Sequence, residues 1–148
     1  MRDFEILLHP RVKEKNIDML GFTEEIWKIS PFIRLLGLEI EKLEHGTCFS
    51  RLKIKNTLLN KHSVVHGGVI YSMADISMGV AVYSTLKKGE ETSTVEIKIN
   101  YLKPAKTSLL TCEAKILKKG KNIAVMEAEI RSGENTLIAK ALGTFMLT

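Results

Sequence analysis

The sequence predicts an α+β domain in which one antiparallel sheet wraps around a single long central helix, preceded by an N-terminal helical extension. Two observations support this prediction. The segment from about Gly68 to Ser84 is apolar or small almost throughout, is long enough for about four to five helical turns, and contains one charged residue, Asp75. Runs of alternating apolar and polar residues flank this segment, which is typical of strands with one buried face.

Residues 1–30 are expected to form a helical extension of unknown role. Thr23 is suited to cap a helix there, and Glu24 and Glu25 follow in the first turn, where carboxylates interact favourably with free backbone N–H groups. Residues 31–148 are expected to form one domain, because a chain of 148 residues that is 45% hydrophobic can build a single sizeable core.

The domain is predicted to begin with a short helix and a hairpin. Ser30 is a preferred helix cap, Pro31 is suited to the first helical position, and Gly37 is suited to end the helix. Residues 38–54 then alternate between apolar and polar side chains, with a turn at Gly46. We therefore expect two antiparallel strands joined by this turn.

The central helix is expected to be buried on all sides and to be followed by four more strands. Short turns around Gly120 and Gly133 separate the last three of them, so we expect a four-strand antiparallel meander. The residues expected to face the core are, strand by strand, Val95, Ile97, Ile99 and Tyr101; Leu110, Cys112, Ala114 and Ile116; Ala124, Met126, Ala128 and Ile130; and Leu137, Ala139, Ala141, Gly143 and Phe145.

Charge and composition argue against nucleic-acid and membrane partners. The formal net charge of +5 comes from scattered lysines, without a block of like charges or an aromatic-basic pattern. The apolar stretch 64–86 carries Asp75 near its centre, where bilayer insertion costs about 2.5–3.5 kcal/mol. Cys48 and Cys112 have no metal-type spacing, and no export signal is visible, so we expect a cytoplasmic protein with reduced thiols.

Asp75 is the leading catalytic candidate. Burying a carboxylate inside an apolar helix is costly unless it is paired, and desolvated acids in clefts are disproportionately catalytic. Helical periodicity places Gly68, Ser72 and Gly79 on the same face, so small side chains surround the acid. The alternative is a structural role in which Asp75 only bonds a neighbouring hydroxyl such as that of Ser72.

His66-Gly67-Gly68 stands where the preceding loop becomes the helix. Backbone N–H groups at a helix N-terminus carry partial positive charge, and glycine allows close approach, so these amides suit a carbonyl oxygen that develops negative charge. An ordinary glycine-rich helix start fits the pattern equally well. His66 is favoured as a structural hydrogen-bonding residue. Its four-residue spacing from His62 does not favour a metal, because the loop offers no neighbouring Glu.

Two polar residues outside the helix are further candidates. Asn60 is a turn former by type, and its amide can also bond a ligand carbonyl. Ser93 has the same parity as Val95 and Ile97, so its hydroxyl is expected on the helix-facing side of the sheet. Many serines at strand ends have no such role.

Three segments form a combined motif: Asn60–Gly68, Met73–Asp75 and Val95–Ala105. Together they resemble the hotdog-fold acyl-CoA thioesterases, and most closely the phenylacetate-degradation and human thioesterase-superfamily type, over about residues 31–148. The resemblance implies a hotdog fold and hydrolysis of acyl-CoA thioesters to a free acid and coenzyme A. It also implies that no metal, cofactor or covalent nucleophile is required.

The resemblance assigns roles by position. Gly67 is expected to polarise the thioester carbonyl through its N–H group, and Asn60 to help hold the carbonyl or the water. Asp75 is expected to deprotonate the water with Ser93 assisting, and His66 to support the loop. The candidates for further substrate contacts are Gly68, Ser72, Lys119 and Lys121. The two lysines lie at a predicted turn, where an ordinary solvated position is the simpler interpretation.

The spacing between Gly67 and Asp75 predicts a site shared by two chains. Eight residues of helix span about 12 Å, which is too far for both groups to act on one carbonyl carbon. The acid is therefore expected from a second copy, in agreement with the resemblance, which implies a homodimer or a homotetramer with composite sites. The alternatives are a module that binds acyl-CoA without hydrolysing it, and another hotdog enzyme such as a dehydratase or hydratase.

Overall fold

The computed structural model describes residues 30–148, so the helix expected around Thr23 lies outside the described residues. Helix α2 (Pro31–Leu36) begins as predicted, with the Ser30 hydroxyl accepting the N–H of Ile33 at 3.4 Å. Gly37 ends the helix at φ 75°, in the left-handed region that glycine tolerates best.

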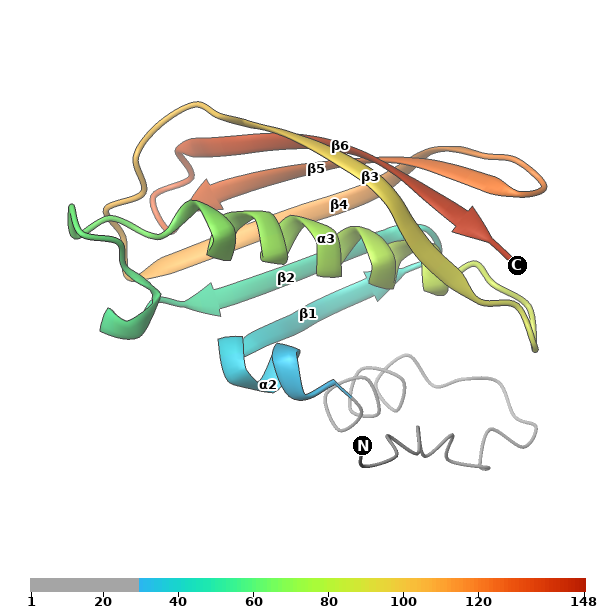
Figure 1. Ribbon diagram of the computed structural model, residues 1–148, viewed down its shortest axis with the longest axis horizontal. Helices are drawn as coiled ribbons and strands as arrows, with labels where there is room; N and C mark the ends of the chain where they lie inside the picture. The colour runs from blue at the N-terminus through green and yellow to red at the C-terminus, as the bar shows by residue number, and fades with distance from the viewer. Residues whose placement is uncertain (1–29) are drawn as a thin grey trace, which may run out of the picture.

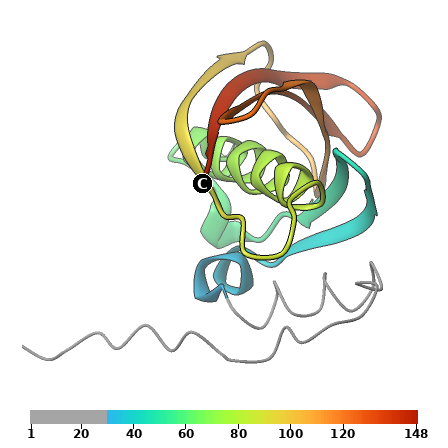
Figure 2. The same ribbon diagram turned by 90° about the vertical axis from the view of Figure 1, so that its right-hand side faces the viewer.

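The remaining elements form one sheet and one long helix. Their bounds are β1 (Leu38–Glu44), β2 (Thr47–Lys53), the 3₁₀ turn η1 (Asn56–Leu58), α3 (Gly67–Tyr83), β3 (Thr92–Tyr101), β4 (Leu109–Lys119), β5 (Ile123–Ser132) and β6 (Leu137–Leu147). The six strands pair in the order β1-β2-β4-β5-β6-β3, and every pair is antiparallel. The sheet curves around α3, as Figures 1 and 2 show, so the predicted fold class is confirmed.

The expected four-strand meander is wrong in one respect. Strands β4, β5 and β6 do follow one another, but β3 crosses to the far edge of the sheet and pairs with β6, while β2 pairs with β4. Alternating hydrophobicity determines which face of a strand is buried, but it does not determine which strand lies beside it. The order of strands was therefore beyond what the pattern could predict.

Helix α3 packs one side against the concave face of the sheet. Its buried residues are Ile70, Met73, Ala74, Ser77, Met78, Val80, Ala81 and Val82. The expectation that this helix is buried on all sides is wrong for the single chain, because Tyr71 and Tyr83 are each 37% exposed and Asp75 is only half-buried. The sheet wraps around part of the helix (Figure 1), and these exposed side chains lie on the side of the helix that the sheet leaves uncovered.

A pair of buried hydroxyl groups joins α3 to the sheet. The Oγ atoms of Ser77 on α3 and Ser50 on β2 lie 2.7 Å apart, and the Ser77 hydroxyl also lies 2.7 Å from the backbone oxygen of Met73. Both side chains are essentially inaccessible to solvent. Buried polar groups require such partners, so this contact specifies how the helix is rotated on the sheet.

Strand β3 is an edge strand with an irregular start. Its register with β6 shifts between Thr94 and Glu96, which leaves Val95 as an extra residue in the ladder. Thr94 lies opposite the buried Phe145, whereas Val95 is 56% exposed, so the expectation that Val95 faces the core is wrong. Within residues 30–148, β3 pairs with β6 alone, so its other edge has unpaired backbone groups.

Candidate functional site

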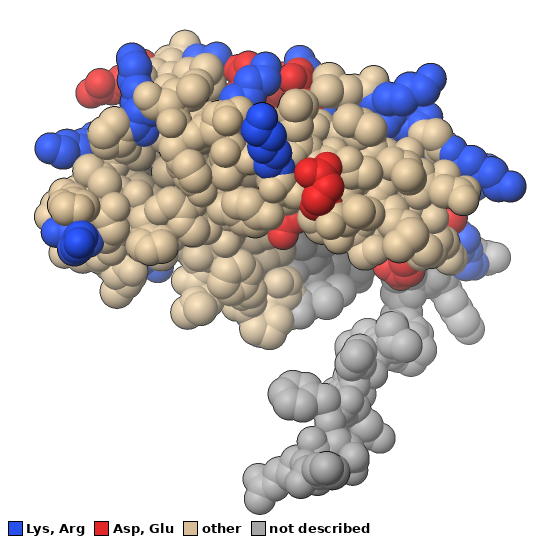
Figure 3. Space-filling view, turned by 45° about the horizontal axis from the view of Figure 1, so that its top comes forward, with Lys and Arg blue, Asp and Glu red and all other residues tan. Residues whose placement is uncertain are grey.

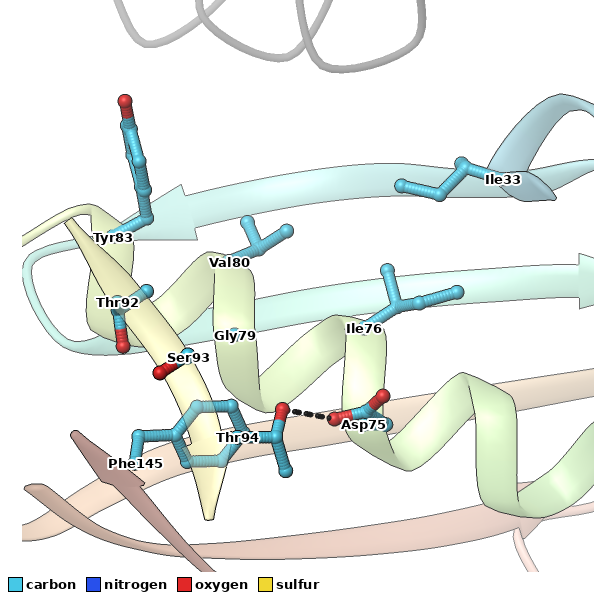
Figure 4. A pocket seen from close by; sticks show the side chains of 10 residues that line it. All are labelled: Ile33, Asp75, Ile76, Gly79, Val80, Tyr83, Thr92, Ser93, Thr94 and Phe145. Carbon is cyan, nitrogen blue, oxygen red and sulfur yellow. Dashed lines mark hydrogen bonds between the residues drawn. The ribbon is translucent and has the colours of Figure 1, made fainter. Parts of the chain in front are cut away.

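The Asp75 carboxylate lies on the open side of α3 and is held by strand β3. Its Oδ1 atom accepts a hydrogen bond of 2.8 Å from the hydroxyl of Thr94, and Figure 4 shows the two side chains pointing at each other. The Oδ2 atom has no hydrogen-bond partner in the described part of the chain. One carboxylate oxygen is therefore fixed while the other remains available to a water molecule.

A cavity of about 280 Å³ opens beside Asp75, between α2, α3 and β3 (Figure 4). Its lining is mostly apolar and contains one charged group, the carboxylate itself. The lining residues are Ile33, Asp75, Ile76, Gly79, Val80, Tyr83, Thr92, Ser93, Thr94 and Phe145. An acid at the margin of an apolar cavity is the arrangement expected for chemistry on an apolar substrate.

The bulge in β3 changes which side chain meets Asp75. Parity with Ile97 placed Ser93 on the helix-facing side, but the extra residue at Val95 reverses this relation, so Thr94 takes the inward position opposite Phe145. Ser93 still lines the cavity, but no hydrogen bond joins it to Asp75. Thr94 was missed because a strand sequence carries no clear signal for a bulge.

At the start of α3, both polar groups of the Gly67–Gly68 peptide are hydrogen-bonded to side chains. The Nδ1 atom of His66 accepts the N–H of Gly68 at 2.9 Å, so His66 caps the helix. The Tyr101 hydroxyl donates to the carbonyl oxygen of Gly67 at 3.0 Å. Burial raises the pKa of the Tyr101 phenol above its ordinary value, so the hydroxyl stays protonated as this hydrogen bond requires.

The Gly67 N–H group has no hydrogen-bond partner within residues 30–148. It belongs to the first turn of α3, where backbone N–H groups have no partner inside the helix and carry the positive end of the helix dipole. This amide is therefore free to donate to an oxygen of a ligand. The expectation that Tyr101 faces the core is wrong, because its side chain is 51% exposed, and nothing in its sequence position pointed to its contact with this peptide.

Asn60 shapes the loop that leads to this helix start. Its Oδ1 atom accepts the N–H groups of His62 at 2.8 Å and of Val64 at 3.4 Å, which is the turn-forming role expected for its type. Its side-chain N–H₂ group has no partner among the described residues and can still donate to a ligand.

A second cavity, of about 250 Å³, lies at this end of α3. It is lined by Val65, Gly67, Ile70, Tyr101, Leu102, Lys103, Pro104 and Ala105. Gly67 lines this cavity and Asp75 lines the other, and neither residue lines both. One chain therefore holds the acid and the free amide in separate places.

The remaining predicted residues lie outside both cavities. Ser72 donates its hydroxyl to the carbonyl oxygen of Gly68 at 2.8 Å, and Lys119 donates to that of Thr85 at 2.7 Å. Lys121 is exposed in the turn between β4 and β5. Residues 30–148 contain no group of three or more His, Cys, Asp or Glu side chains able to hold a metal, and none of their helices is long and apolar enough to cross a bilayer.

A family model described as the thioesterase superfamily matches residues 62–139, which is more than half of the chain and includes both Gly67 and Asp75. The chain belongs to the thioesterase superfamily. It is a thioester hydrolase with the hotdog fold, as the combined motif predicted.

Three proteins are similar to this chain. SSO1253 of Saccharolobus solfataricus, which is named as an esterase, is 38% identical over 141 residues, and the match covers 92% of each chain. The medium/long-chain acyl-CoA thioesterase YigI of Escherichia coli is 33% identical, covering 79% of this chain and 85% of its own. A Streptococcus pneumoniae thioesterase solved with coenzyme A is 31% identical, covers 75% and 85%, and superposes with a TM-score of 0.70.

Proposed function

We propose that this protein hydrolyses acyl-coenzyme A thioesters to a free acid and coenzyme A. The observation that carries the proposal is the Asp75 carboxylate, fixed by Thr94 at one oxygen and open at the other, beside an apolar cavity. The name of YigI and the coenzyme A bound to the S. pneumoniae relative support this choice of substrate.

The chemistry needs a polarised carbonyl and an activated water. The Gly67 N–H donates to the thioester oxygen as negative charge develops on it, and the Asn60 amide helps to hold that oxygen or the water. Asp75 accepts a proton from the water, which attacks the carbonyl carbon. The carbon–sulfur bond then breaks, and the proton passes to the departing thiolate, so that the products are a carboxylic acid and a thiol.

The acid and the amide of one site come from two copies of the chain. Gly67 and Asp75 line different cavities, and about 12 Å of helix separates them. A two-fold dimer brings Asp75, at the middle of one α3, to the Gly67 end of the other and creates two such sites. The unpaired edge of β3, which carries Thr94 and Tyr101, provides backbone groups for this association.

The phosphates of coenzyme A need cations at the rim of the site. Lys103 lines the cavity of Gly67 and is exposed, whereas the Lys119 ammonium group is engaged with the Thr85 carbonyl. Lys103 is therefore the stronger candidate for a phosphate contact, while Lys121, exposed in its turn and outside both cavities, stays a prediction. In the face seen in Figure 3, Lys and Arg side chains are spread singly, without the continuous basic surface that a nucleic-acid partner would require.

Release of free thiol from a panel of acyl-CoA thioesters tests the reaction. Asp75→Asn should keep the fold, because the amide oxygen can still accept from Thr94, and should lower turnover by about 10²–10⁴ fold, the usual contribution of a general base. Hydrolysis at the wild-type rate in the folded variant would remove Asp75 from the mechanism. Tight binding of acyl-CoA without turnover by the wild type would favour a binding module instead.

Mixing two inactive variants tests the shared site. Asp75→Ala and Asn60→Ala should each be nearly inactive alone. After co-refolding, about half of the dimers are mixed, and each mixed dimer has one site with both defects and one with neither, so about a quarter of wild-type activity should return. If each site were built within one chain, a mixture with confirmed subunit exchange would be no more active than its parents.

A further inference from the structure

Gly79 occupies a costly position in the helix. It lies one turn after Asp75 on the same face of α3, well inside the helix. Glycine destabilises a helix interior relative to alanine, because it loses more backbone freedom on folding. A glycine here therefore requires a compensating reason.

Packing within the chain does not supply that reason. The backbone of Gly79 is not left-handed, and a Cβ atom added to it would first meet Cε1 of Phe145 at 3.6 Å, an ordinary contact distance. Gly143 on β6 is a useful contrast, since a Cβ there would lie 3.1 Å from Cε of Met78 and 3.2 Å from Cγ1 of Ile97. Close packing explains Gly143 but not Gly79.

The cavity beside Asp75 does supply a reason. Gly79 lies in its lining between Asp75 and Tyr83, and the other wall residues here include Ile76, Val80 and Phe145 (Figure 4). A side chain longer than a methyl group at position 79 would project into this space. The absence of a side chain keeps the cavity continuous from the acid toward the far end of the helix.

We propose that this cavity binds the aliphatic tail of the acyl group and that Gly79 sets the longest tail the enzyme accepts. The inference rests on the proposed function. The lining is apolar apart from hydroxyls and has one charged residue, the anionic Asp75, so it suits an alkyl chain and repels the phosphates of coenzyme A. Position 79 lies about 6 Å along the helix from the acid, so a side chain there would stop all but short tails.

Chain-length profiles of Gly79→Leu and Gly79→Ala test the inference. Lauroyl-, octanoyl- and butyryl-CoA are the probes, and kcat/KM is measured for each. In Gly79→Leu, the ratio of lauroyl to butyryl kcat/KM should fall at least about 10-fold below the wild-type ratio, and Gly79→Ala should change it in the same direction by less. Unchanged ratios in both folded variants would overturn the inference.

Stability provides an independent measurement. Gly79→Ala should raise the melting temperature, because alanine favours the helix and its methyl group fits, whereas Gly143→Ala should lower it by crowding Met78. A lower melting temperature for Gly79→Ala, or its dissociation into monomers by size-exclusion chromatography, would show that Gly79 serves packing, and would overturn the inference. If the wild type hydrolyses none of the probes, the proposed function fails. The inference can then be tested by binding alone: calorimetry gives the Kd of lauroyl-CoA and of butyryl-CoA, and Gly79→Leu should weaken the binding of lauroyl-CoA more than that of butyryl-CoA.

Discussion

At the scale of single residues, the Thr94–Asp75 hydrogen bond decides how the acid can act. A carboxylate on a helix can rotate about its side-chain bonds, and each orientation presents a different oxygen to the substrate. The 2.8 Å bond from Thr94 holds Oδ1, so Oδ2 is the atom left to accept a proton from water. The strand therefore contributes to the reaction by orienting a group that belongs to the helix.

Replacing the hydroxyl of Thr94 tests this arrangement. Thr94→Val keeps the branched shape and removes the donor, so kcat should fall about 10-fold, equivalent to about 1.4 kcal/mol, with a smaller change in KM. Ser93→Ala is the matched control, because Ser93 lines the same cavity without bonding the acid. Steady-state kinetics on both variants measure the two losses of kcat. A greater loss in Ser93→Ala than in Thr94→Val would mean that Ser93, and not Thr94, assists Asp75.

The candidate site was partly predictable from individual residues. Asp75 was identifiable because it is the one charge in a long apolar segment, and Gly67 because glycines precede a helix where free amides collect. Thr94 and Tyr101 were not identifiable in this way. The contact of Thr94 depends on the bulge in β3, and that of Tyr101 depends on how β3 crosses the helix. Such relations join residues far apart in the chain, and one sequence does not record them.

At the scale of elements, the Ser50–Ser77 contact fixes α3 on the sheet. The helix is apolar on much of its surface, so hydrophobic contact alone does not favour one rotation strongly. The hydroxyl pair in the core does favour one rotation, since any other rotation separates Ser50 from Ser77 and costs Ser50 this buried hydrogen bond. Ser77 lies two residues after Asp75, so the rotation that pairs Ser77 also turns Asp75 to the open side.

Removal of one hydroxyl should therefore be costly. Ser77→Ala should lower the free energy of unfolding by about 1–3 kcal/mol, because Ser50 loses the hydroxyl of Ser77 as a buried hydrogen-bond partner. Ser50→Ala combined with Ser77→Ala should cost less than the sum of the single changes. Urea denaturation of the three variants measures these values, with Ser72→Ala as a helix control that should change little. Additive losses would show that the two hydroxyls act independently.

Elements were easier to predict than their arrangement. The hairpin, the central helix and the later strands follow directly from the period of their apolar residues and from their turn residues. The place of β3 at the far edge does not, because period-two alternation is the same for every strand that covers this helix.

At the scale of the whole molecule, the buried thiols of Cys48 and Cys112 make the stability of the fold depend on pH. Burial raises the pKa of Cys112 from 9.0 to about 12, and burial also raises the pKa of Cys48. Above about pH 9 the unfolded chain loses thiol protons that the folded chain keeps. The unfolded state then binds fewer protons, so stability falls as pH rises from about 9 toward 12.

The slope of stability against pH is the quantity to measure. Each thiol should contribute up to about 1.4 kcal/mol per pH unit in this window. Denaturant unfolding between pH 8 and pH 10.5 should therefore give a steeper decline for the wild type than for Cys48→Ala with Cys112→Ala. Exposed lysines and tyrosines titrate equally in both proteins and cancel in the comparison. Equal slopes would mean that the thiols do not govern alkaline stability.

The position of β3 also sets an order of assembly. Helix α3 and β3 are adjacent in the chain, but Thr94 lies opposite Phe145 on β6, the last strand of the described part. A growing polypeptide therefore exposes Asp75 and the whole of β3 before any partner for that strand exists. Pairing between segments so far apart is slow to form. We therefore expect β3 to be fixed in place, and the orientation of Asp75 to become stable, only after β6 has left the ribosome.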